Sequence, residues 1–255
     1  MKESEFINEV SKYYDTRASG SDSIKAAGQW HQIDSINEIC LEISKKIGLN
    51  SKSRVLEIGC GSGVLGNWIK SKCSTYYGFD ISHEMLKSFL NESNTETVNL
   101  LRASADKIPF QKDSFDIIIL NGVAMYFIND DFLSRVLKEI QEIISKNGLI
   151  FIGETSTPSR YYWEFAWFQN LSKFKQNFVK PYIKFRKWIA TKNSKIGGKW
   201  TNTYSTVSEK FLKDYFKGKG KINISDAAAY TIRKKKSGKN SKGNKRVDFT
   251  IKLSE

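Results

Sequence analysis

The sequence predicts an α/β fold in which a mostly parallel sheet carries helices on both faces. Short apolar runs alternate with helical patterns from residue 51 onward, and a glycine-rich turn follows the first run. One run, "FDIIILN" at 115–121, is almost continuously apolar. Alternating strands and helices are typical of a parallel sheet, and a strand covered on both faces must be apolar on both. The 255 residues suit one such domain.

The strands and helices can be placed along the first 155 residues. Residues 1–50 are helical and amphipathic, because isoleucines from Ile33 to Ile43 recur at helical spacing and Gly48 marks the end. Strands are expected at 54–59, 76–81, 98–103, 115–121 and 148–154. Helices are expected at 64–71, 83–91 and 131–146.

The pattern changes after residue 155. An aromatic, basic, helix-like segment comes first, and Thr206 with Glu209 then forms a capping-box pattern for another helix. "KINISDAAAYTIRK" (221–234) and "RVDFTIKL" (246–253) are predicted as two strands, antiparallel because their connection is short. We expect one domain made of a helical cap (1–50), a cofactor-binding core (51–155), a helical insertion or lid (156–216) and a C-terminal strand pair (217–255).

The net charge of +14 comes from 41 basic and 27 acidic residues, and the basic excess lies in the C-terminal half. Residues 165–208 contain nine lysines and arginines and no acid, and residues 233–246 contain eight and no acid. One interpretation is a lysine-rich, solvated surface. The other is an acidic partner, which could be a phosphorylated substrate, nucleic acid or an anionic membrane.

Composition excludes several classes of protein. No run of ~18 apolar residues occurs, so we expect no membrane-spanning helix. The N-terminal stretch has early acids and no apolar core, unlike a secretory signal. Cys40, Cys60 and Cys73 are odd in number and lack metal-ligand spacing, which argues against zinc or a disulfide framework. We therefore expect a cytoplasmic protein without a metal.

The glycine-rich stretch "EIGCGSG" (57–63) separates the first strand from a helix. Missing side chains let a ligand contact the main chain, and amides at the helix start can donate to it, so this turn predicts a cofactor cradle. A tight turn without a ligand is the alternative. The dinucleotide pattern G-x-G-x-x-G fails because Val64 replaces its third glycine, which disfavours a dehydrogenase. Asp80 ends the next strand, where a carboxylate can accept from two ribose hydroxyls.

Four motifs in order resemble class I S-adenosylmethionine-dependent methyltransferases: "VLEIGCGSGVLGNWI", "GFDISHEML", "ASADKIPFQKDSFDIIILNGVAMYF" and "GLIFIGE". The closest likeness is to the methyltransferase type 11 group, which includes quinone-biosynthesis and other small-molecule enzymes. It covers roughly residues 50–155. It implies a Rossmann-like, seven-stranded sheet with an antiparallel last strand, and S-adenosyl-L-methionine as the cofactor.

The resemblance also implies contacts for individual residues. The cofactor-binding residues it implies are Gly59, Gly61 and Gly63 under the methionine portion, Glu57 near the amino end, Asp80 on the ribose, Ile81 and Met85 beside adenine, an Ala105 amide on the ring, and Asn121 at the sulfonium end. Family members commonly have an acid just before the alanine, where this chain has Ser104. Either Asp106 or the Ser104 hydroxyl would take the adenine amino group, and we favour Asp106.

The chemistry of a sulfonium methyl group leaves the protein two tasks, which are to align a nucleophile and, where needed, to remove its proton. Tyr126 and His31 are the candidate catalytic residues. Tyr126 follows the fourth strand, where family members often carry a histidine that faces the acceptor; a half-buried aromatic is the alternative. A lone histidine on such a helix is more often a structural surface residue, which is the alternative for His31. Tyr13 and Tyr14 resemble an N-terminal aromatic element that closes over the cofactor.

The insertion is where we expect the acceptor to bind. Its apolar helical face consists of Phe178, Tyr182, Phe185 and Ile189, and its other faces carry Lys180, Lys184 and Lys187. Such a face is core, a lid over a bulky apolar acceptor, or an interfacial helix on anionic lipid.

The function predicted from the sequence is methyl transfer to a small or lipid-like acceptor through oxygen, nitrogen or carbon. The alternatives are RNA methylation, which the basic C-terminal half favours, and a non-catalytic binding protein of the same fold. "NGVAMYF" stands where base N-methyltransferases often show an Asn-Pro-Pro-aromatic element, which makes nucleic acid the weaker prediction.

Overall fold

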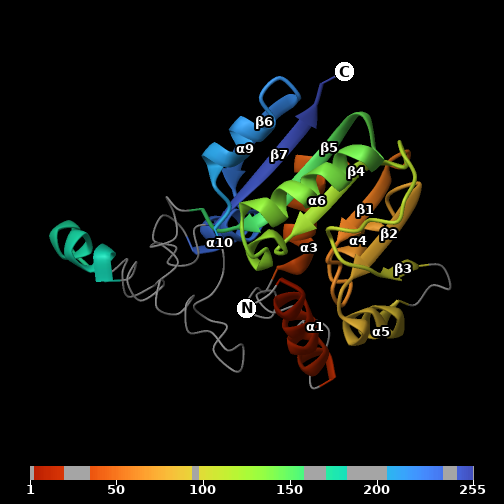
Figure 1. The fold of residues 1–255 in the computed structure, drawn as a ribbon, viewed down its shortest axis with the longest axis horizontal. Helices are drawn as coiled ribbons and strands as arrows, with labels where there is room; N and C mark the ends of the chain where they lie inside the picture. Colours follow the sequence, from red (N-terminus) through yellow and green to blue (C-terminus); the bar gives the residue numbers. More distant parts are fainter. Residues whose placement is uncertain are drawn as a thin grey trace.

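The computed structural model describes residues 3–19, 35–93, 98–157, 171–182, 206–237 and 246–254. The helices of these parts are α1 (Glu3–Ser19), α3 (Ile36–Ile47), α4 (Gly66–Ile69), α5 (His83–Glu92), the 3-10 turn η2 (Ala124–Tyr126), α6 (Asp130–Ile143), α9 (Glu209–Tyr215) and α10 (Ala228–Ser237). The strands are β1 (Arg54–Ile58), β2 (Thr75–Asp80), β3 (Asn99–Arg102), β4 (Phe115–Asn121), β5 (Ile144–Thr155), β6 (Gly220–Asp226) and β7 (Val247–Leu253). Figure 1 shows their arrangement.

The strands form one seven-stranded sheet in the order β3-β2-β1-β4-β5-β7-β6. Neighbours among the first five strands are parallel, and β7 runs antiparallel to both β5 and β6. The register aligns Ile118 of β4 with Ile150 of β5, and Ile150 with Ile251 of β7. This confirms the predicted Rossmann-like, mostly parallel sheet with an antiparallel last strand.

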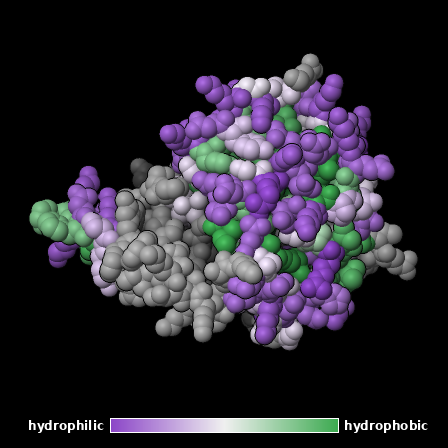
Figure 2. Space-filling model, viewed as in Figure 1, coloured by the Kyte–Doolittle hydropathy of each residue, from purple (hydrophilic) through white to green (hydrophobic). Residues whose placement is uncertain are grey.

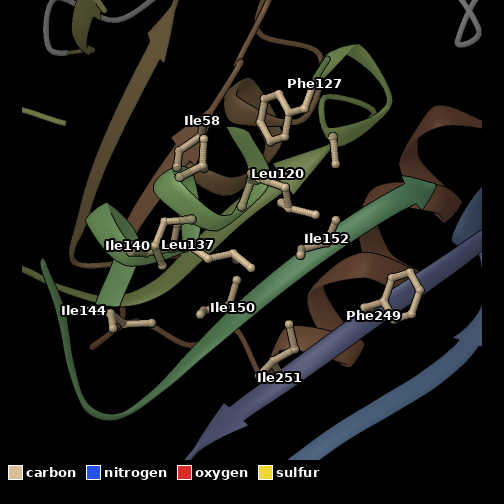
Figure 3. Packing of buried hydrophobic residues seen from close by; sticks show 14 of the residues in the cluster. Ile58, Leu120, Phe127, Leu137, Ile140, Ile144, Ile150, Ile152, Phe249 and Ile251 are labelled. Carbon is tan, nitrogen blue, oxygen red and sulfur yellow. The ribbon is translucent and has the colours of Figure 1, made fainter. Parts of the chain in front are cut away.

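Each face of the sheet has its own hydrophobic core, because successive residues of a strand point to opposite faces. Leu56, Ile118 and Ile150 pack with α6 and α9 on one face, as Figure 3 shows for part of this cluster. Their neighbours Val55 and Ile119 pack with α3, α4, α5 and α10 on the other. The sheet is therefore covered by helices on both sides, as the apolar run of β4 predicts.

Local sequence signals explain where α6 begins and which face it buries. The Asn129 side chain accepts a hydrogen bond from the Phe132 amide at 2.8 Å, and Asp130 and Asp131 lie in the first turn, where the helix dipole favours negative charge. Apolar side chains recur at helical spacing from Phe132 to Ile143 and are buried against the sheet. The helix ends where β5 begins at Ile144, four residues before the predicted strand start.

Two sequence predictions in the C-terminal part are wrong. The segment at 221–234 is not one strand: β6 ends at Asp226 and α10 follows, because Ala228, Ala229 and Ile232 bury one helical face in the core shared with α3. The cap of α9 is also not Thr206. Ser208 accepts from the Phe211 amide at 3.2 Å instead.

Residues 173–182 form the described helical part of the insertion, which stands away from the sheet in Figure 1. Phe174, Phe178 and Tyr182 are exposed, and the rings of Phe174 and Phe178 lie 4.9 Å apart. Figure 2 shows apolar side chains on this helix, at the far left. Phe185, Ile189, Lys184 and Lys187 of the predicted face lie outside the described residues.

Candidate active site

A cavity of about 350 Å³ opens at the carboxyl ends of β1, β2, β4 and β5, and α1 covers it. The carboxyl edge of a parallel sheet is where ligands bind in α/β folds. Most residues predicted from the sequence line this cavity: Glu57, Gly59, Gly61, Asp80, Ile81, Met85, Ala105, Asn121 and Tyr126. Gly63 and Asp106 are not among the lining residues. His31 lies outside the described residues.

The three glycines of the 57–63 loop are needed for different physical reasons. A Cβ at Gly59 would lie 2.4 Å from Val123, and one at Gly63 would lie 2.2 Å from Phe89, so packing excludes side chains at both positions. Gly61 has a φ of +54°, and nothing lies within 4 Å of a Cβ built there. A side chain at Gly61 would therefore enter open space on a cavity-lining residue, which is the arrangement a ligand close to the main chain requires.

Asp80 connects the glycine loop to the turn after β2. Its Oδ2 accepts from the Gly61 amide at 2.9 Å, and its Oδ1 accepts from the Ser82 amide at 2.8 Å. Burial raises the pKa of Asp80, while these backbone donors lower it. Each carboxylate oxygen can accept more than one hydrogen bond, so Asp80 can also bind hydroxyl groups of a ligand.

Helix α1 is fixed across the same turn. The Ser11 hydroxyl donates to the Ile81 carbonyl at 3.1 Å, and the Asp15 carboxylate accepts from the Ser82 hydroxyl at 2.6 Å and the Glu84 amide at 3.2 Å. This places Tyr14 over the cavity, where its ring meets Tyr126 edge-on with centroids 5.5 Å apart. Tyr13 does not line the cavity; Arg17 donates to its hydroxyl.

The adenine side of the predicted site contains Ile81, Met85, Ser104 and Ala105. The Ser104 hydroxyl donates to the Asp106 carboxylate, so the hydroxyl and the acid predicted as alternatives contact each other. Ser104 is the one of the two that lines the cavity. The role of Asp106 in reading the adenine amino group stays a prediction.

Glu57 and Glu154 are buried acids that line the cavity, and burial shifts the pKa of each. Burial raises the pKa of Glu57 to about 8, although the Tyr76 hydroxyl, which donates to Glu57 at 2.6 Å, lowers it. Burial and the nearby Asp248 raise the pKa of Glu154 to about 7. Perturbed carboxyls in a cavity are typical of functional sites.

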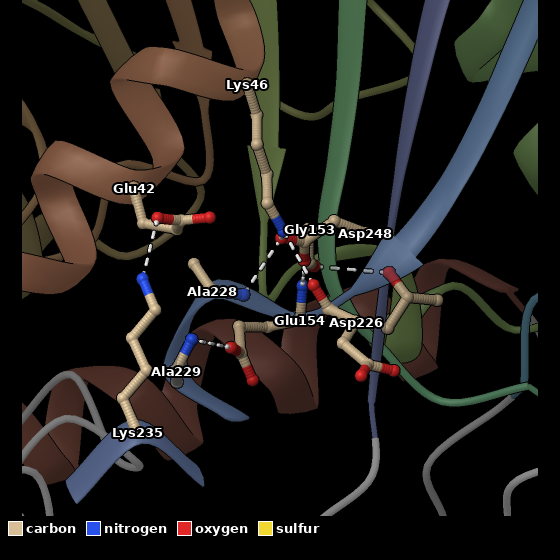
Figure 4. Close-up of polar contacts among 10 residues, drawn as sticks. Glu42, Lys46, Gly153, Glu154, Asp226, Ala228, Ala229, Lys235 and Asp248 are labelled. Atoms are coloured by element: carbon tan, nitrogen blue, oxygen red, sulfur yellow. Dashed lines mark hydrogen bonds and ion pairs between the residues drawn. The ribbon is translucent and has the colours of Figure 1, made fainter. Parts of the chain in front are cut away.

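Glu154 is a cavity residue that the sequence analysis did not single out. It is the penultimate residue of β5 and has a left-handed φ of +52°, and its amide donates to Asp248 Oδ1 at 2.9 Å. Asp248 Oδ2 accepts from the Ala228 amide at 3.0 Å and from Lys46 at 2.7 Å, as Figure 4 shows. The only sequence signal was an acid at the end of a predicted strand, in the motif "GLIFIGE".

Residues 56–152 match a protein family described as "Methyltransferase domain". This region is a class I methyltransferase domain. This region contains most of strands β1 to β5 and the glycine loop that contacts Asp80. Strands β6 and β7 lie outside it in sequence and complete the same sheet.

Curated relatives of this methyltransferase domain differ in length. An uncharacterized methyltransferase of Schizosaccharomyces pombe, C70.08c, is 32% identical over 119 residues, which are 44% of this chain and 44% of the relative. The demethylmenaquinone methyltransferase of Staphylococcus aureus (strain JH9) is 26% identical over 191 residues, covering 71% of this chain and 73% of the relative. The chain spans 43% of a third relative, the uncharacterized methyltransferase YcgJ of Bacillus subtilis, and only 1% and 3% of two much longer relatives.

A solved structure shares the fold of this chain at low sequence identity. Phosphoethanolamine N-methyltransferase 1 of Haemonchus contortus, in complex with phosphoethanolamine and S-adenosylhomocysteine, superposes with a TM-score of 0.69 and 11% identity. The superposition covers 100% of this chain and 50% of that one.

The cavity fits S-adenosylmethionine, the cofactor implied by the methyltransferase domain. Gly61 leaves open space beside the main chain, where a narrow aliphatic chain can pass. Among the described residues, none donates to the buried Oδ1 of Asn121, which can accept from an ammonium group. The Asp80 carboxylate, which lines the same cavity, also suits a ligand that carries a positive sulfonium charge.

The described parts of the chain contain no group of three or more His, Cys, Asp or Glu side chains that could hold a metal ion. Within the same residues, no helix has both the length and the apolar character needed to cross a bilayer.

Proposed function

We propose that the protein transfers a methyl group from S-adenosylmethionine to a small or lipid-like acceptor. The observation that supports this most is the open space at Gly61, opposite Asp80, in a cavity at the carboxyl ends of β1 and β2. The cofactor supplies an electrophilic methyl group on sulfonium. The chain's own residues bind it, exclude water with α1, and position the acceptor.

The acceptor part of the cavity is largely apolar. Phe6, Ile7 and Val10 line it from α1, and Met125 and Phe127 line it from the segment after β4. We expect this wall to contact the apolar body of an acceptor. Calorimetry tests the proposal: S-adenosylhomocysteine should bind and NAD should not, and tight binding of NAD without S-adenosylhomocysteine binding would contradict it.

Asp80→Ala is expected to weaken S-adenosylhomocysteine binding by about 1.5–3 kcal/mol, because hydrogen bonds to a charged group are lost. The same change frees the Gly61 amide, so Asp80→Asn serves as a second variant that keeps the size of the side chain. Calorimetry measures both affinities, and circular dichroism checks folding. If the Asp80→Ala protein folds and binds with wild-type affinity, Asp80 does not bind the ribose and another residue must do so.

Tyr126→Phe is expected to lower the turnover number and to leave S-adenosylhomocysteine affinity unchanged. We propose that the Tyr126 hydroxyl contacts the acceptor, since the residue lines the cavity and packs on Tyr14. A loss of ~10²–10⁴-fold would identify the hydroxyl as a general base, and a smaller loss would identify it as an orienting group. An unchanged turnover number would show that the Tyr126 hydroxyl has no role in the reaction and that the ring only packs against Tyr14.

The helix at residues 173–182 is proposed to meet an anionic, partly apolar partner such as a lipid surface. Phe174 and Phe178 are exposed beside Lys173, Lys175 and Lys180. The protein should sediment with phosphatidylglycerol vesicles and dissociate in 1 M salt, where the Debye length is ~3 Å. A Phe174→Ser/Phe178→Ser variant should sediment less; equal sedimentation of variant and wild type would contradict this role.

A further inference from the structure

Glu154 is a buried carboxyl in the cavity wall, far from the residues proposed to hold the ribose. Only 8% of the surface of Glu154 is exposed to solvent. The sheet order β2-β1-β4-β5 puts β5 three strand spacings from β2, about 14 Å at the usual separation. Asp80 and Glu154 therefore lie at opposite sides of the cavity, and Glu154 is on the side left for the acceptor.

The backbone of Glu154 is held in an unusual conformation. A residue other than glycine at a φ of +52° is strained by about 1 kcal/mol or more and persists only where its surroundings impose it. The Asp248 carboxylate imposes it by accepting the Glu154 amide, and Lys46 holds Asp248 in turn. The Ala229 amide then donates to Glu154 Oε1 at 3.2 Å. No described residue donates to Oε2, so that oxygen can accept from a ligand.

The charges around Glu154 restrict what that ligand can be. Arg246 is buried, lines the same cavity, and its Nη1 lies 3.5 Å from the Glu154 carbonyl oxygen. A fixed cation beside the site disfavours an ammonium group. It favours a neutral hydroxyl, because the oxyanion left after deprotonation is attracted to Arg246. A carboxyl whose pKa lies near neutrality is also suited to take a proton at physiological pH.

We propose that Glu154 accepts the proton of an aromatic or enolic hydroxyl on the methyl acceptor, and that Arg246 stabilises the resulting oxyanion. This assignment rests on the proposed methyl transfer. The O–H bond breaks and its proton joins the Glu154 carboxylate. The electron pair left on oxygen forms the bond to the transferred methyl carbon, whose former bonding electrons remain on sulfur. The proton then leaves Glu154 for water.

Other charged groups face Glu154 and have to be separated from it in a pH experiment. Asp248 and Arg246 approach from the β7 side, Arg233 lies on α10, and Lys46 on α3 reaches Asp248. Burial also raises the pKa of Asp248. A Glu154→Gln variant removes the Glu154 titration and keeps the Asp248 carboxyl, so a pH dependence that persists in the variant belongs to Asp248.

Binding of phenol and anisole to the protein saturated with S-adenosylhomocysteine tests the assignment without turnover. Nuclear magnetic resonance titrations at pH 8 should show that phenol, which has the hydroxyl, binds about tenfold more tightly than its methyl ether, the scale for a hydrogen bond to a charged group. The ratio should approach one in Glu154→Gln, and should fall in wild type at pH 5.5, where Glu154 is protonated. Glu142→Gln, at an exposed position of α6, should keep the wild-type ratio.

The outcomes separate this assignment from the proposed function. Equal binding of phenol and anisole to wild type, no binding of either, or an unchanged ratio in Glu154→Gln would overturn the role of Glu154. Failure of S-adenosylhomocysteine to bind wild type would overturn the proposed function instead, and the fragment ratio would then be measured on the protein alone. If Glu154→Gln does not fold, the wild-type pH series decides.

Discussion

Lys46→Met is expected to lower the free energy of unfolding by about 3–5 kcal/mol, the cost of leaving a buried charge without its partner. Lys46 Nζ lies 2.7 Å from Asp248 Oδ2 and 2.6 Å from the Asp226 carbonyl oxygen. The side chains are 14% and 1% exposed. Asp248 also binds the amides of Glu154 and Ala228, so the pair connects α3, β5, β7 and α10. Urea denaturation at pH 7.5 measures the loss.

Lys87→Met is the matched control, because it makes the same chemical change in an exposed ion pair. Lys87 lies 2.8 Å from Glu84, and the side chains are 52% and 34% exposed. The expected loss is at most about 0.5 kcal/mol. The deficit of Lys46→Met should also shrink as the pH falls, since an unpaired Asp248 can be protonated. Similar losses of unfolding free energy in both variants would show that the buried pair stabilises the protein no more than the exposed one.

Glu57→Gln is expected to stabilise the ligand-free protein at pH 9 by up to about 5 kcal/mol, on a scale of ~1.4 kcal/mol per pKa unit. The pKa of Glu57 is about 8 in the folded protein and 4.5 as its ordinary value. Between these values the folded state binds more protons than the unfolded state, so wild-type stability falls as the pH rises from about 4.5 to 8. Glutamine removes this dependence and keeps an oxygen for the Tyr76 hydroxyl.

Denaturation curves of wild type and Glu57→Gln at pH 5, 7 and 9 measure this effect. The two proteins should differ little at pH 5 and most at pH 9. The variant should retain a smaller slope of the same sign, because burial also raises the pKa of Glu154 and Asp80. Glu142→Gln, at an exposed position, should follow wild type. A constant difference between the curves at all three pH values would contradict the buried, neutral state of Glu57.

Local patterns predict most of the fold. The apolar run "FDIIILN" coincides with β4, Phe115–Asn121, because burial on both faces leaves a continuous signal. The alanines after Asp226 were predicted as a strand because they continue an alternating segment without a break. Alanine favours a helix intrinsically, and the burial of α10 against α3 decides the outcome. That contact joins residues far apart in the chain and leaves no local pattern.

The candidate site also has one part that local sequence predicts and one part that depends on long-range contacts. The part of the cavity around Gly61 and Asp80 could be predicted because these residues are close in sequence, and the structure shows them in contact. Glu154 depends on a left-handed backbone that Asp248, 94 residues further along the chain, holds in place. No window of sequence contains that relation. The part of the cavity at the end of β5 could therefore not be identified before the strands were paired.

The position of β7 between β5 and β6 has a consequence for synthesis of the chain. A nascent protein emerges from the ribosome in sequence order, so β6 is complete before the strand it pairs with exists. Until residues 247–253 emerge, the apolar edge of β5 stays open to other strands and the Asp248 carboxylate is missing. Such late, long-range pairing slows folding, which makes this edge the place where premature association would begin.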